Sequence, residues 1–382
     1  MQYRSFGQLD WKPSALGFGA MRLPIIDNDP SQIDEAEATR MIRYAIDHGV
    51  NYVDTAYPYH RQNSELFLGR ALQDGYRERI KLATKMPCWK IETAADFDRY
   101  LDEQLEKLQT TFVDFYLLHS LDASTWSKVR DLDVLGWAES AIAGGRIGHL
   151  GFSFHDKYEV FQEIVDASDL WTFCQIQYNY MDIDNQAGTK GLKYAAARGL
   201  AVVIMEPLRG GMLTLKVPPS VQAIWDSASR QRTPAQWALD WLWSQPEVSL
   251  VLSGMSTMEQ VIENVESAGR SGIGTLTGED LYLVDRVRET YRELCAIPCT
   301  ACEYCLPCPS GVHIPEVFEI YNDMLMYGDE PRARMFYSWL DEKARADLCT
   351  ECGECLTKCP QHIEIPDWLK RVHEALCQEA AA

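Results

Sequence analysis

The stretches "IKLATK" (Ile80–Lys85) and "DFYLLHS" (Asp114–Ser120) decide the fold of this chain. Each is a short apolar run that ends in or near an ionisable side chain, and a helical pattern separates the two. Nearly continuous apolar runs between helices are typical of a parallel sheet that helices cover. The two stretches therefore predict buried parallel strands.

The same alternation extends from about Leu16 to Ser253 and predicts eight strands. Eight strand–helix units close into a (β/α)8 barrel, the TIM barrel of the α/β class. A doubly wound open sheet is the alternative, but "GFGAMRLP" lacks the G-x-G-x-x-G that would follow its first strand. The predicted strands are Ala15–Gly19, Asn51–Thr55, Ile80–Lys85, Asp114–Ser120, His149–Ser153, Thr172–Tyr178, Leu200–Glu206 and Val248–Gly254.

The stretch "DEAEATRMIRYAIDHG" predicts one of the covering helices, with Gly49 as its stop. Gly199 is placed to end another helix before the next strand. The apolar face of the first helix is expected to consist of Ala36, Met41, Ile42 and Ala45.

The formal net charge of −20 would repel the phosphates of nucleic acids, so we expect no nucleic-acid partner. No apolar run reaches the roughly 18 residues of a membrane-spanning helix. The N-terminus also lacks the basic and apolar regions of a secretory signal. We therefore expect no membrane partner and a cytoplasmic location.

The composition changes at Cys295, and we predict two domains, a barrel over 1–294 and a smaller domain over 295–382. Eight of the twelve cysteines lie in two runs of the second domain. Helical patterns lie between the runs, which predicts a small helical module with an internal repeat. The repeat consists of "CTACEYCLPCP" (Cys299–Pro309) and "CTECGECLTKCP" (Cys349–Pro360), continued by "CPSGVHIPEVF" and "CPQHIEIPDWL".

The second cysteine run has the spacing that bacterial ferredoxins use for a [4Fe–4S] cluster, and the first run lacks one residue before Cys308. In two-cluster ferredoxins the last cysteine of each run binds the other cluster. Structural zinc is the alternative, but zinc usually takes two separated cysteine pairs. The predicted ligand sets are Cys299, Cys302, Cys305 and Cys359 for one cluster, and Cys349, Cys352, Cys355 and Cys308 for the other.

Three successive predicted strands end near Asp54, Lys85 and His119, and Tyr59 follows the first of these by five residues. A buried lysine needs an anion, which Asp54 supplies. A lysine beside a phenol is expected to lower the tyrosine pKa below its usual value of about 10. Such a tyrosine can act as an acid or base, while His119 can orient a carbonyl oxygen. The four residues together predict an active site.

These stretches resemble the aldo-keto reductases. "DTAYPYHRQNSE", "LATK" and "DFYLLHS" are similar to the catalytic stretches of that family. "GFS", "QIQYN", "MEPLRGG" and "LSGMSTMEQVIEN" are similar to its cofactor-binding stretches. The resemblance covers residues 3–290.

The resemblance implies an enzyme that transfers hydride between a nicotinamide and a carbonyl or alcohol substrate. Tyr59 would be the proton donor, since the family spacing selects it over Tyr57, and His119 would hold the carbonyl. Ser153 and Gln175 would hold the nicotinamide carboxamide. The implied cofactor-binding residues are Gly19, Met21, Asp54, Ser153, Gln175, Met205, Leu208, Ser253, Gly254, Gln260 and Asn264.

The chain departs from the family pattern at three places. Phe154 and His155 follow the serine where an asparagine is usual, and Met205 stands where many members stack a tyrosine on the nicotinamide. Gly254 and Gln260 stand where members that prefer the 2′-phosphate carry basic residues, so we expect weak selectivity for NADP over NAD.

The whole chain resembles the aldo-keto reductase branch that carries a C-terminal ferredoxin-like extension. A nicotinamide moves two electrons as hydride, whereas each cluster moves one. The first hypothesis is therefore an oxidoreductase whose clusters serve an external electron carrier, with a flavin in the barrel mouth as intermediary. The second is an enzyme that uses NAD(P)(H) alone, with structural or sensing clusters, and the third is an electron-transfer or partner-binding module with a vestigial barrel.

Trp89, Trp126 and Tyr178 follow strand ends and are either substrate-pocket or packing residues. The sequence leaves the substrate and the oligomeric state open.

Overall fold

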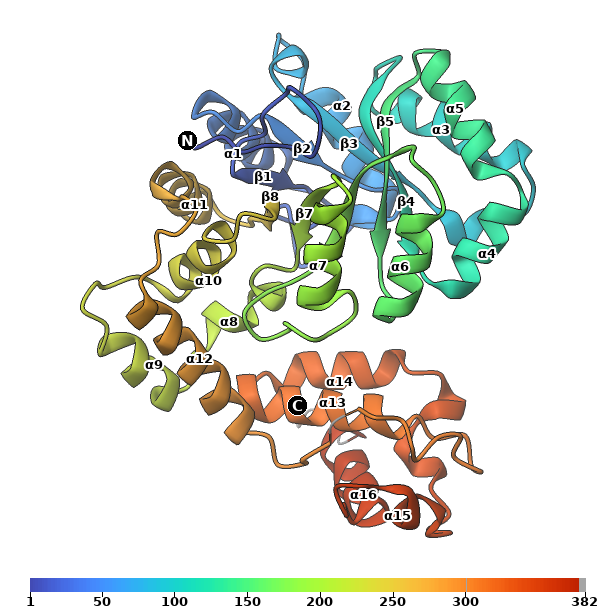
Figure 1. The fold of residues 1–382 in the computed structure, drawn as a ribbon, viewed down its shortest axis with the longest axis vertical. Coiled ribbons are helices and arrows are strands. Elements are labelled where there is room, and N and C mark those ends of the chain that lie inside the picture. Colours follow the sequence, from blue (N-terminus) through green and yellow to red (C-terminus); the bar gives the residue numbers. More distant parts are fainter. Residues whose placement is uncertain (300, 378–382) are drawn as a thin grey trace. The chain divides into compact units, whose positions relative to one another are not determined.

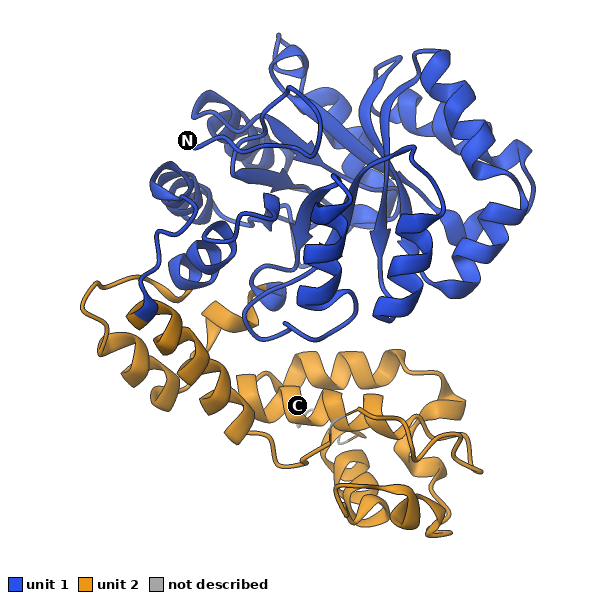
Figure 2. Cartoon of the chain, viewed as in Figure 1, with its two compact units in different colours: residues 1–210, 235–278 blue, residues 211–234, 279–382 orange. Residues whose placement is uncertain are grey.

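The computed structural model describes residues 1–299 and 301–377. Thr300 and residues 378–382 of the predicted second domain lie outside the described residues. The chain divides into two compact units (Figure 2). Unit 1 comprises Met1–Gly210 and Ala235–Gly278, and unit 2 comprises Gly211–Pro234 and Glu279–Ala382. The domain boundary predicted after residue 294 stays a prediction.

Unit 1 contains a closed barrel whose eight parallel strands pair in chain order (Figure 1). Each predicted strand overlaps one observed strand, so the predicted barrel is confirmed over the open sheet. The strands are β1 (Leu16–Gly19), β2 (Tyr52–Asp54), β3 (Lys81–Met86), β4 (Val113–Leu121), β5 (Ile147–Phe154), β6 (Trp171–Gln177), β7 (Ala201–Met205) and β8 (Val248–Gly254).

Helices cover the outside of the barrel. The α-helices of unit 1 are α1 (Glu35–Asp47), α2 (Asn63–Ala71), α3 (Ala95–Lys107), α4 (Ala123–Asp131), α5 (Val134–Ala143), α6 (Tyr158–Asp166), α7 (Gly188–Ala197), α10 (Pro234–Trp243) and α11 (Met258–Arg270). Short 3₁₀ helices in the same unit are η1 (Tyr59–Gln62), η2 (Arg77–Arg79) and η3 (Cys88–Lys90), and η4 (Arg209–Gly211) spans the boundary between the units.

Helix α1 illustrates how the predicted pattern compares with the structure. Asp34 caps the helix by accepting a hydrogen bond from the Glu37 amide, and the chain turns at Gly49 with a φ of 98°. Ala36 is exposed, so the prediction that it belongs to the apolar face is wrong. It precedes Met41 by five residues, which is about 140° around a helix with 3.6 residues per turn. The buried face consists of Ala38, Met41, Ile42, Ala45 and Ile46.

Alternate strand residues fill the barrel interior. Phe6, from the segment before β1, packs among them with its ring centroid 5.1 Å from that of Phe115 and 5.6 Å from that of Phe173. Side chains two residues apart on a strand point to the same face. The strand residues two positions beyond this core therefore also face the barrel interior, and they include predicted active-site residues. The core consists of Phe6, Tyr52, Ala83, Phe115, Leu117, Phe173, Ala201, Val203, Leu250 and Leu252.

Unit 2 is helical, as the sequence predicts. Asn322 joins two of its segments, because its side chain accepts from the amide of Ile297 at 3.0 Å and donates to the carbonyl of the same residue at 2.8 Å. No helix among the described residues of either unit is long and apolar enough to cross a membrane. The helices of unit 2 are α8 (Met212–Leu215), α9 (Pro219–Asp226), α12 (Gly278–Glu293, which begins at the last residue of unit 1), α13 (Ile314–Tyr327), α14 (Glu330–Trp339), α15 (Glu354–Lys358) and α16 (Ile365–Cys377), with the 3₁₀ helices η5 (Glu342–Ala344) and η6 (Ala346–Leu348).

Replacement of Phe6 by alanine tests the interior packing. We expect Phe6→Ala to lower the free energy of unfolding by about 3–5 kcal/mol, because a fully buried ring is lost and a cavity remains. Urea denaturation followed by circular dichroism measures the change. Leu66→Ala, on an exposed position of α2, is the control and should change the free energy little. Equal losses for the two variants would contradict the packing described.

Candidate functional site

Lys85 lies at the centre of the predicted site, and its side chain is fully buried. Its Nζ lies 2.5 Å from Asp54 Oδ1, 2.8 Å from the carbonyl oxygen of Thr55 and 3.3 Å from Tyr59 Oη. An ammonium group has three protons to donate, and these three acceptors match them. The arrangement explains how a buried cation is tolerated at this point of the barrel.

The geometry leaves the Tyr59 hydroxyl proton available. Tyr59 Oη accepts from Lys85, and an ammonium group cannot accept in return. The phenolic proton can therefore be donated to another oxygen in the barrel mouth. This is the arrangement that a general acid needs.

The loop that carries Tyr59 is fixed by its neighbour His60. The Nε2 atom of His60 accepts from the Leu23 amide at 3.1 Å, so Nδ1 is the protonated nitrogen and donates to the Pro30 carbonyl at 2.9 Å. His60, Arg61 and Gln62 all have positive φ angles, between 51° and 74°. The sequence gives no clear signal for this anchor.

Burial governs the ionisation of the site. Burial raises the pKa of Tyr59 above its usual value, and the Lys85 ammonium opposes this rise without overcoming it. The expectation of a lowered tyrosine pKa is therefore wrong, because desolvation of the phenolate outweighs the attraction of the cation. Burial alone would lower the pKa of Lys85, but Asp54 and Tyr59 together raise it, so the lysine stays charged. Burial also raises the pKa of Asp54, and Lys85 opposes this.

His119 faces the same space. Its ring centroid lies 6.1 Å from that of Tyr59 and 5.1 Å from that of Trp89. Burial, followed by the charges of Lys85 and His155, holds the pKa of His119 well below its usual value, so the ring is neutral. Its Nδ1 atom is buried without a hydrogen-bond partner. A neutral imidazole beside the tyrosine can hydrogen-bond a carbonyl oxygen.

The other candidate aromatic residues lie in different surroundings. Tyr57 packs edge-to-face on Tyr100, with centroids 5.4 Å apart, and Lys107 Nζ lies 4.3 Å from the centroid of its ring. Trp126 and Tyr178 are buried in the hydrophobic core. Trp89 alone of the three proposed pocket aromatics is substantially exposed, at 43%, beside His119.

Ser153 and Gln175 are paired neighbours on β5 and β6. Ser153 Oγ accepts from the Ser120 amide at 2.7 Å, and Gln175 Nε2 lies 3.5 Å from the sulfur of Met205. The Oε1 atom of Gln175 is buried without a hydrogen-bond partner. An acceptor of this kind suits a carboxamide N–H group of a ligand.

The remaining predicted cofactor residues lie at the ends of β1, β7 and β8 and on α11. Gly19 pairs with Gly254, and Asn264 Nδ2 donates to Ser253 Oγ at 3.1 Å. The side chain of Gln260 already has a partner within the protein, because its Oε1 atom accepts a hydrogen bond from the Ser256 amide at 2.8 Å. Met21 is half exposed and Leu208 is partly buried against the core.

Arg22 and Glu206 are site residues that the sequence reasoning missed. The Nη2 atom of Arg22 lies 3.5 Å from Glu206 Oε1, and a Cβ atom at Gly254 would lie 3.2 Å from carbons of the Arg22 side chain. A basic group therefore lies beside the position where none was expected. The signal was the "MRLP" stretch, which places an arginine three residues after the end of the first strand at Gly19.

The cysteines of the two runs line two small cavities. Cys305 and Ile314 contribute to both, so the cavities are neighbours. In the described parts of the chain, no group of three or more His, Cys, Asp or Glu side chains is arranged to bind a single metal ion directly. The cysteines are instead grouped around the two cavities. One cavity is lined by Cys299, Cys302, Cys305 and Cys359, and the other by Cys305, Cys308, Cys349, Cys352 and Cys355.

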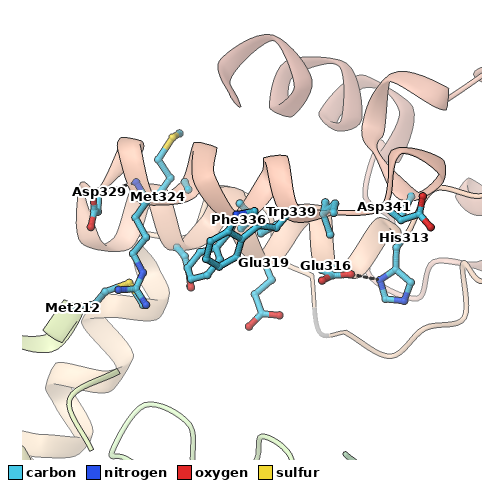
Figure 3. Close-up of a pocket in the computed structure, with 15 residues that line it drawn as sticks. Met212, His313, Glu316, Glu319, Met324, Asp329, Phe336, Trp339 and Asp341 are labelled. Carbon is cyan, nitrogen blue, oxygen red and sulfur yellow. Dashed lines mark hydrogen bonds and ion pairs between the residues drawn. The ribbon is translucent and has the colours of Figure 1, made fainter. Parts of the chain in front are cut away.

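A groove of about 470 Å³, whose lining contains no cysteine, lies on unit 2 (Figure 3). Phe336 and Trp339 form its aromatic part, with ring centroids 5.4 Å apart, and His313 Nδ1 lies 3.2 Å from a carboxylate oxygen of Glu316. Helix α13 contributes Glu316 to this groove and Phe318 to the Cys299 cavity. One helix therefore separates the two.

Comparison with known protein families identifies both parts of the chain. Residues 15–271 match the Aldo/keto reductase family, and residues 298–364 match a 4Fe-4S dicluster domain. The first match covers more than half of the chain, and the second covers both cysteine runs.

Individual relatives agree with this result. The chain is 25% identical over 331 residues to L-galactose dehydrogenase of Arabidopsis thaliana, covering 82% of this chain and 98% of that protein. It is 26% identical to 6-dehydroglucose reductase of Novosphingobium aromaticivorans, covering 69% and 90%.

Solved structures share the barrel. The holo form of the aldo-keto reductase AKR11C1 from Bacillus halodurans aligns with a TM-score of 0.63 at 25% identity, over 75% of this chain and 96% of that chain. An aldo-keto reductase from Klebsiella pneumoniae in complex with NADPH aligns with a TM-score of 0.60 at 24% identity, over 75% and 96%. The chain belongs to the aldo/keto reductase family of oxidoreductases and carries a 4Fe-4S dicluster domain after its barrel.

Proposed function

We propose that the barrel interconverts a small carbonyl compound and its alcohol with NAD(P)(H), and that Tyr59 is the proton donor. One observation carries the proposal. Lys85 directs its three protons to Asp54, Thr55 and Tyr59, and this leaves the phenolic proton free to move to a substrate.

The residues of the site have separate roles in this proposal. Tyr59 is protonated at neutral pH, since burial keeps its pKa above the usual value for tyrosine, which is itself well above neutral. It donates its proton to the carbonyl oxygen as that oxygen becomes negative. Lys85 stabilises the phenolate that results, and Asp54 holds the lysine in place. Neutral His119 hydrogen-bonds the carbonyl oxygen and orients it toward Tyr59. Trp89 excludes water on one side of the pocket.

The inward residues of β5 to β7 suit a nicotinamide. The unpartnered Oε1 of Gln175 can accept from its carboxamide N–H group, and Met205 can cover one face of the ring. When bound, the nicotinamide supplies or accepts the hydride. A structural relative was solved with NADPH. Arg22 already faces Glu206, so weak selectivity between NADP and NAD remains our expectation.

Tyr59→Phe tests the proposed proton donor. We expect the variant to lose carbonyl reduction by at least about a hundredfold, because general acid catalysis contributes roughly 10²–10⁴-fold. Reduction of benzaldehyde, within a panel of aliphatic and aromatic aldehydes, is measured with NADPH and NADH. Nucleotide binding should be unchanged, since the ring is kept.

Tyr57→Phe is the matched control and should keep its activity, because the Tyr57 ring packs on Tyr100 rather than against Lys85. Full turnover by Tyr59→Phe would refute the assignment.

We also propose that the second domain holds two [4Fe–4S] clusters with crossed ligands. Cys359 of the second run would join Cys299, Cys302 and Cys305, with which it shares a cavity. Cys308 of the first run would join Cys349, Cys352 and Cys355 in the other cavity. Four thiolates around an apolar cavity suit a cubane cluster. Such thiols persist in a reducing compartment, which agrees with the expected cytoplasmic location.

Paired cysteine substitutions test the crossing. We expect Cys302→Ala with Cys359→Ala to remove about half of the iron, no more than either single variant, because both residues bind one cluster. Cys302→Ala with Cys308→Ala should remove both clusters. Iron analysis and paramagnetic resonance of anaerobically purified protein measure the result. The reverse pattern would show that each run binds its own cluster.

We propose further that the clusters exchange electrons with the barrel site and with an external carrier. Because hydride carries two electrons and a cluster accepts one, this exchange requires a group such as a flavin that can handle both. The common lining of the two cavities by Cys305 and Ile314 supports passage of electrons between the clusters.

Anaerobic titration with NADH and NADPH tests this exchange. We expect a bound flavin in the optical spectrum and bleaching of the cluster absorbance when nucleotide is added, since electrons then reach the clusters. Protein denatured before the titration provides the control for released flavin. Clusters that stay oxidised in protein without flavin would favour the structural or sensing role instead.

A further inference from the structure

Asp54 and Lys85 each have a threonine as a direct neighbour in the chain. Thr55 follows Asp54 directly, and Thr84 precedes Lys85. Thr84 points out of the barrel, because neighbouring strand residues point to opposite sides, and Thr55, the residue after β2, meets Ser64 of helix α2. Both are fully buried, so their hydroxyl groups need partners within the protein.

Ser64, at the start of α2, holds the first of these hydroxyls. Its Oγ donates to the carbonyl of Ala20 at 3.0 Å and lies 2.8 Å from Thr55 Oγ1. A serine hydroxyl has one proton, so the proton between the two hydroxyls comes from Thr55. Ser64 thus ties the end of β2 to the end of β1.

Glu65, the next residue, binds the second threonine hydroxyl, that of Thr84. Its Oε1 accepts from Thr84 Oγ1 at 2.6 Å and from Gln104 Nε2, on α3, at 2.5 Å. Gln104 Nε2 also donates to the carbonyl of Lys85 at 3.0 Å. Tyr116 Oη donates to Gln104 Oε1 at 2.7 Å, which fixes the orientation of the amide. The peptide group of Lys85 is therefore held from outside the barrel.

We propose that Glu65 is a positioning residue that, through Thr84 and Gln104, fixes Lys85 at its hydrogen-bonding distance from Tyr59. The inference rests on the function proposed above. Glu65 touches neither Lys85 Nζ nor Tyr59, and it acts by accepting from two groups that flank the lysine backbone.

The two carboxylate oxygens of Glu65 differ in their surroundings. Its side chain is fully buried, and the nearest cation, Lys107 Nζ, lies 3.9 Å from Oε2 and 2.6 Å from Glu103. Burial raises the pKa of Glu65, while Thr84, Gln104 and Lys107 oppose the rise. Oε2 accepts no hydrogen bond, so a glutamine amide nitrogen can replace it without loss of the two bonds to Oε1.

Loss of this support should be visible in the ionisation of Tyr59. The charged and titratable groups that face Tyr59 are Lys85 on β3, Asp54 on β2, His119 on β4 and Glu206 after β7. Of these, Lys85 favours the phenolate. When the lysine moves away, the tyrosine pKa rises, and alcohol oxidation, which needs the phenolate as base, then requires a higher pH.

Three variants test the proposal with benzyl alcohol and benzaldehyde as probes. Glu65→Leu should lower kcat for both directions by about tenfold to a hundredfold, as expected when a reacting group is misplaced by about 1 Å. It should also shift the acidic limb of the oxidation profile, where the rate rises as the phenolate forms, to higher pH, with the nucleotide Kd within about twofold of the unaltered protein. Glu65→Gln should restore most of kcat and the original pH profile.

Thr84→Val keeps the proposal testable if Glu65→Leu does not fold, since it removes one hydroxyl group and keeps the shape of the side chain. It should show the same pH shift in smaller measure, and Thr84→Ser should reverse it. Glu106→Gln, on an exposed position of α3, is the matched control for loss of an acidic group.

The outcomes separate this inference from the proposed function. If Tyr59→Phe keeps its activity, the proposed function fails. If Tyr59→Phe is inactive while folded Glu65→Leu and Thr84→Val keep the kcat and pH profile of the unaltered protein, the positioning role fails. Loss of thermal stability without a pH shift would likewise overturn it, because a merely structural residue would give that result.

Discussion

A buried ammonium group constrains the barrel more than any other single feature. Lys85 has no access to water, and an unpartnered cation in such a place would be very costly. Its three protons therefore fix where Asp54, Thr55 and Tyr59 can lie. The closed sheet makes this possible, because the register pairs Asp54 with Ala83 and so brings the carboxylate within reach of the lysine two residues later.

The barrel and the inward residues of the site could be predicted from sequence because both follow the same alternation. Asp54, Lys85 and Gln175 each stand two residues beyond a residue of the barrel interior, and strands of this kind are visible as apolar runs. The sign of the Tyr59 pKa shift could not be predicted, since it depends on how completely the phenol is desolvated. Spacing along a chain identifies charged neighbours but does not give burial.

The residues that support the site could not be predicted from the sequence either. Glu65 and Gln104 lie on different helices, and in sequence each resembles an ordinary polar residue of an amphipathic helix. Only the fold shows that both side chains are fully buried and meet at Thr84. Arg22 was missed for a similar reason, because Glu206, 184 residues further along the chain, and Gly254, still further on, come close to it only in the fold. For the cysteines, by contrast, local spacing was informative, since each run supplies most of the cysteines that line one cavity.

The course of the chain between the two units has a consequence for how the protein can be divided. Gly211–Pro234 belongs to unit 2, while the residues on either side of it belong to unit 1. A truncation after α11 would remove the cysteines but leave behind α9, whose Val221, Ile224 and Trp225 are buried in the full chain. Unit 2, which contains the two cysteine runs, is therefore more than a C-terminal extension. It is encoded at two separate places, an insertion after β7 and an extension after α11, and exchange of this part between proteins would have to transfer both.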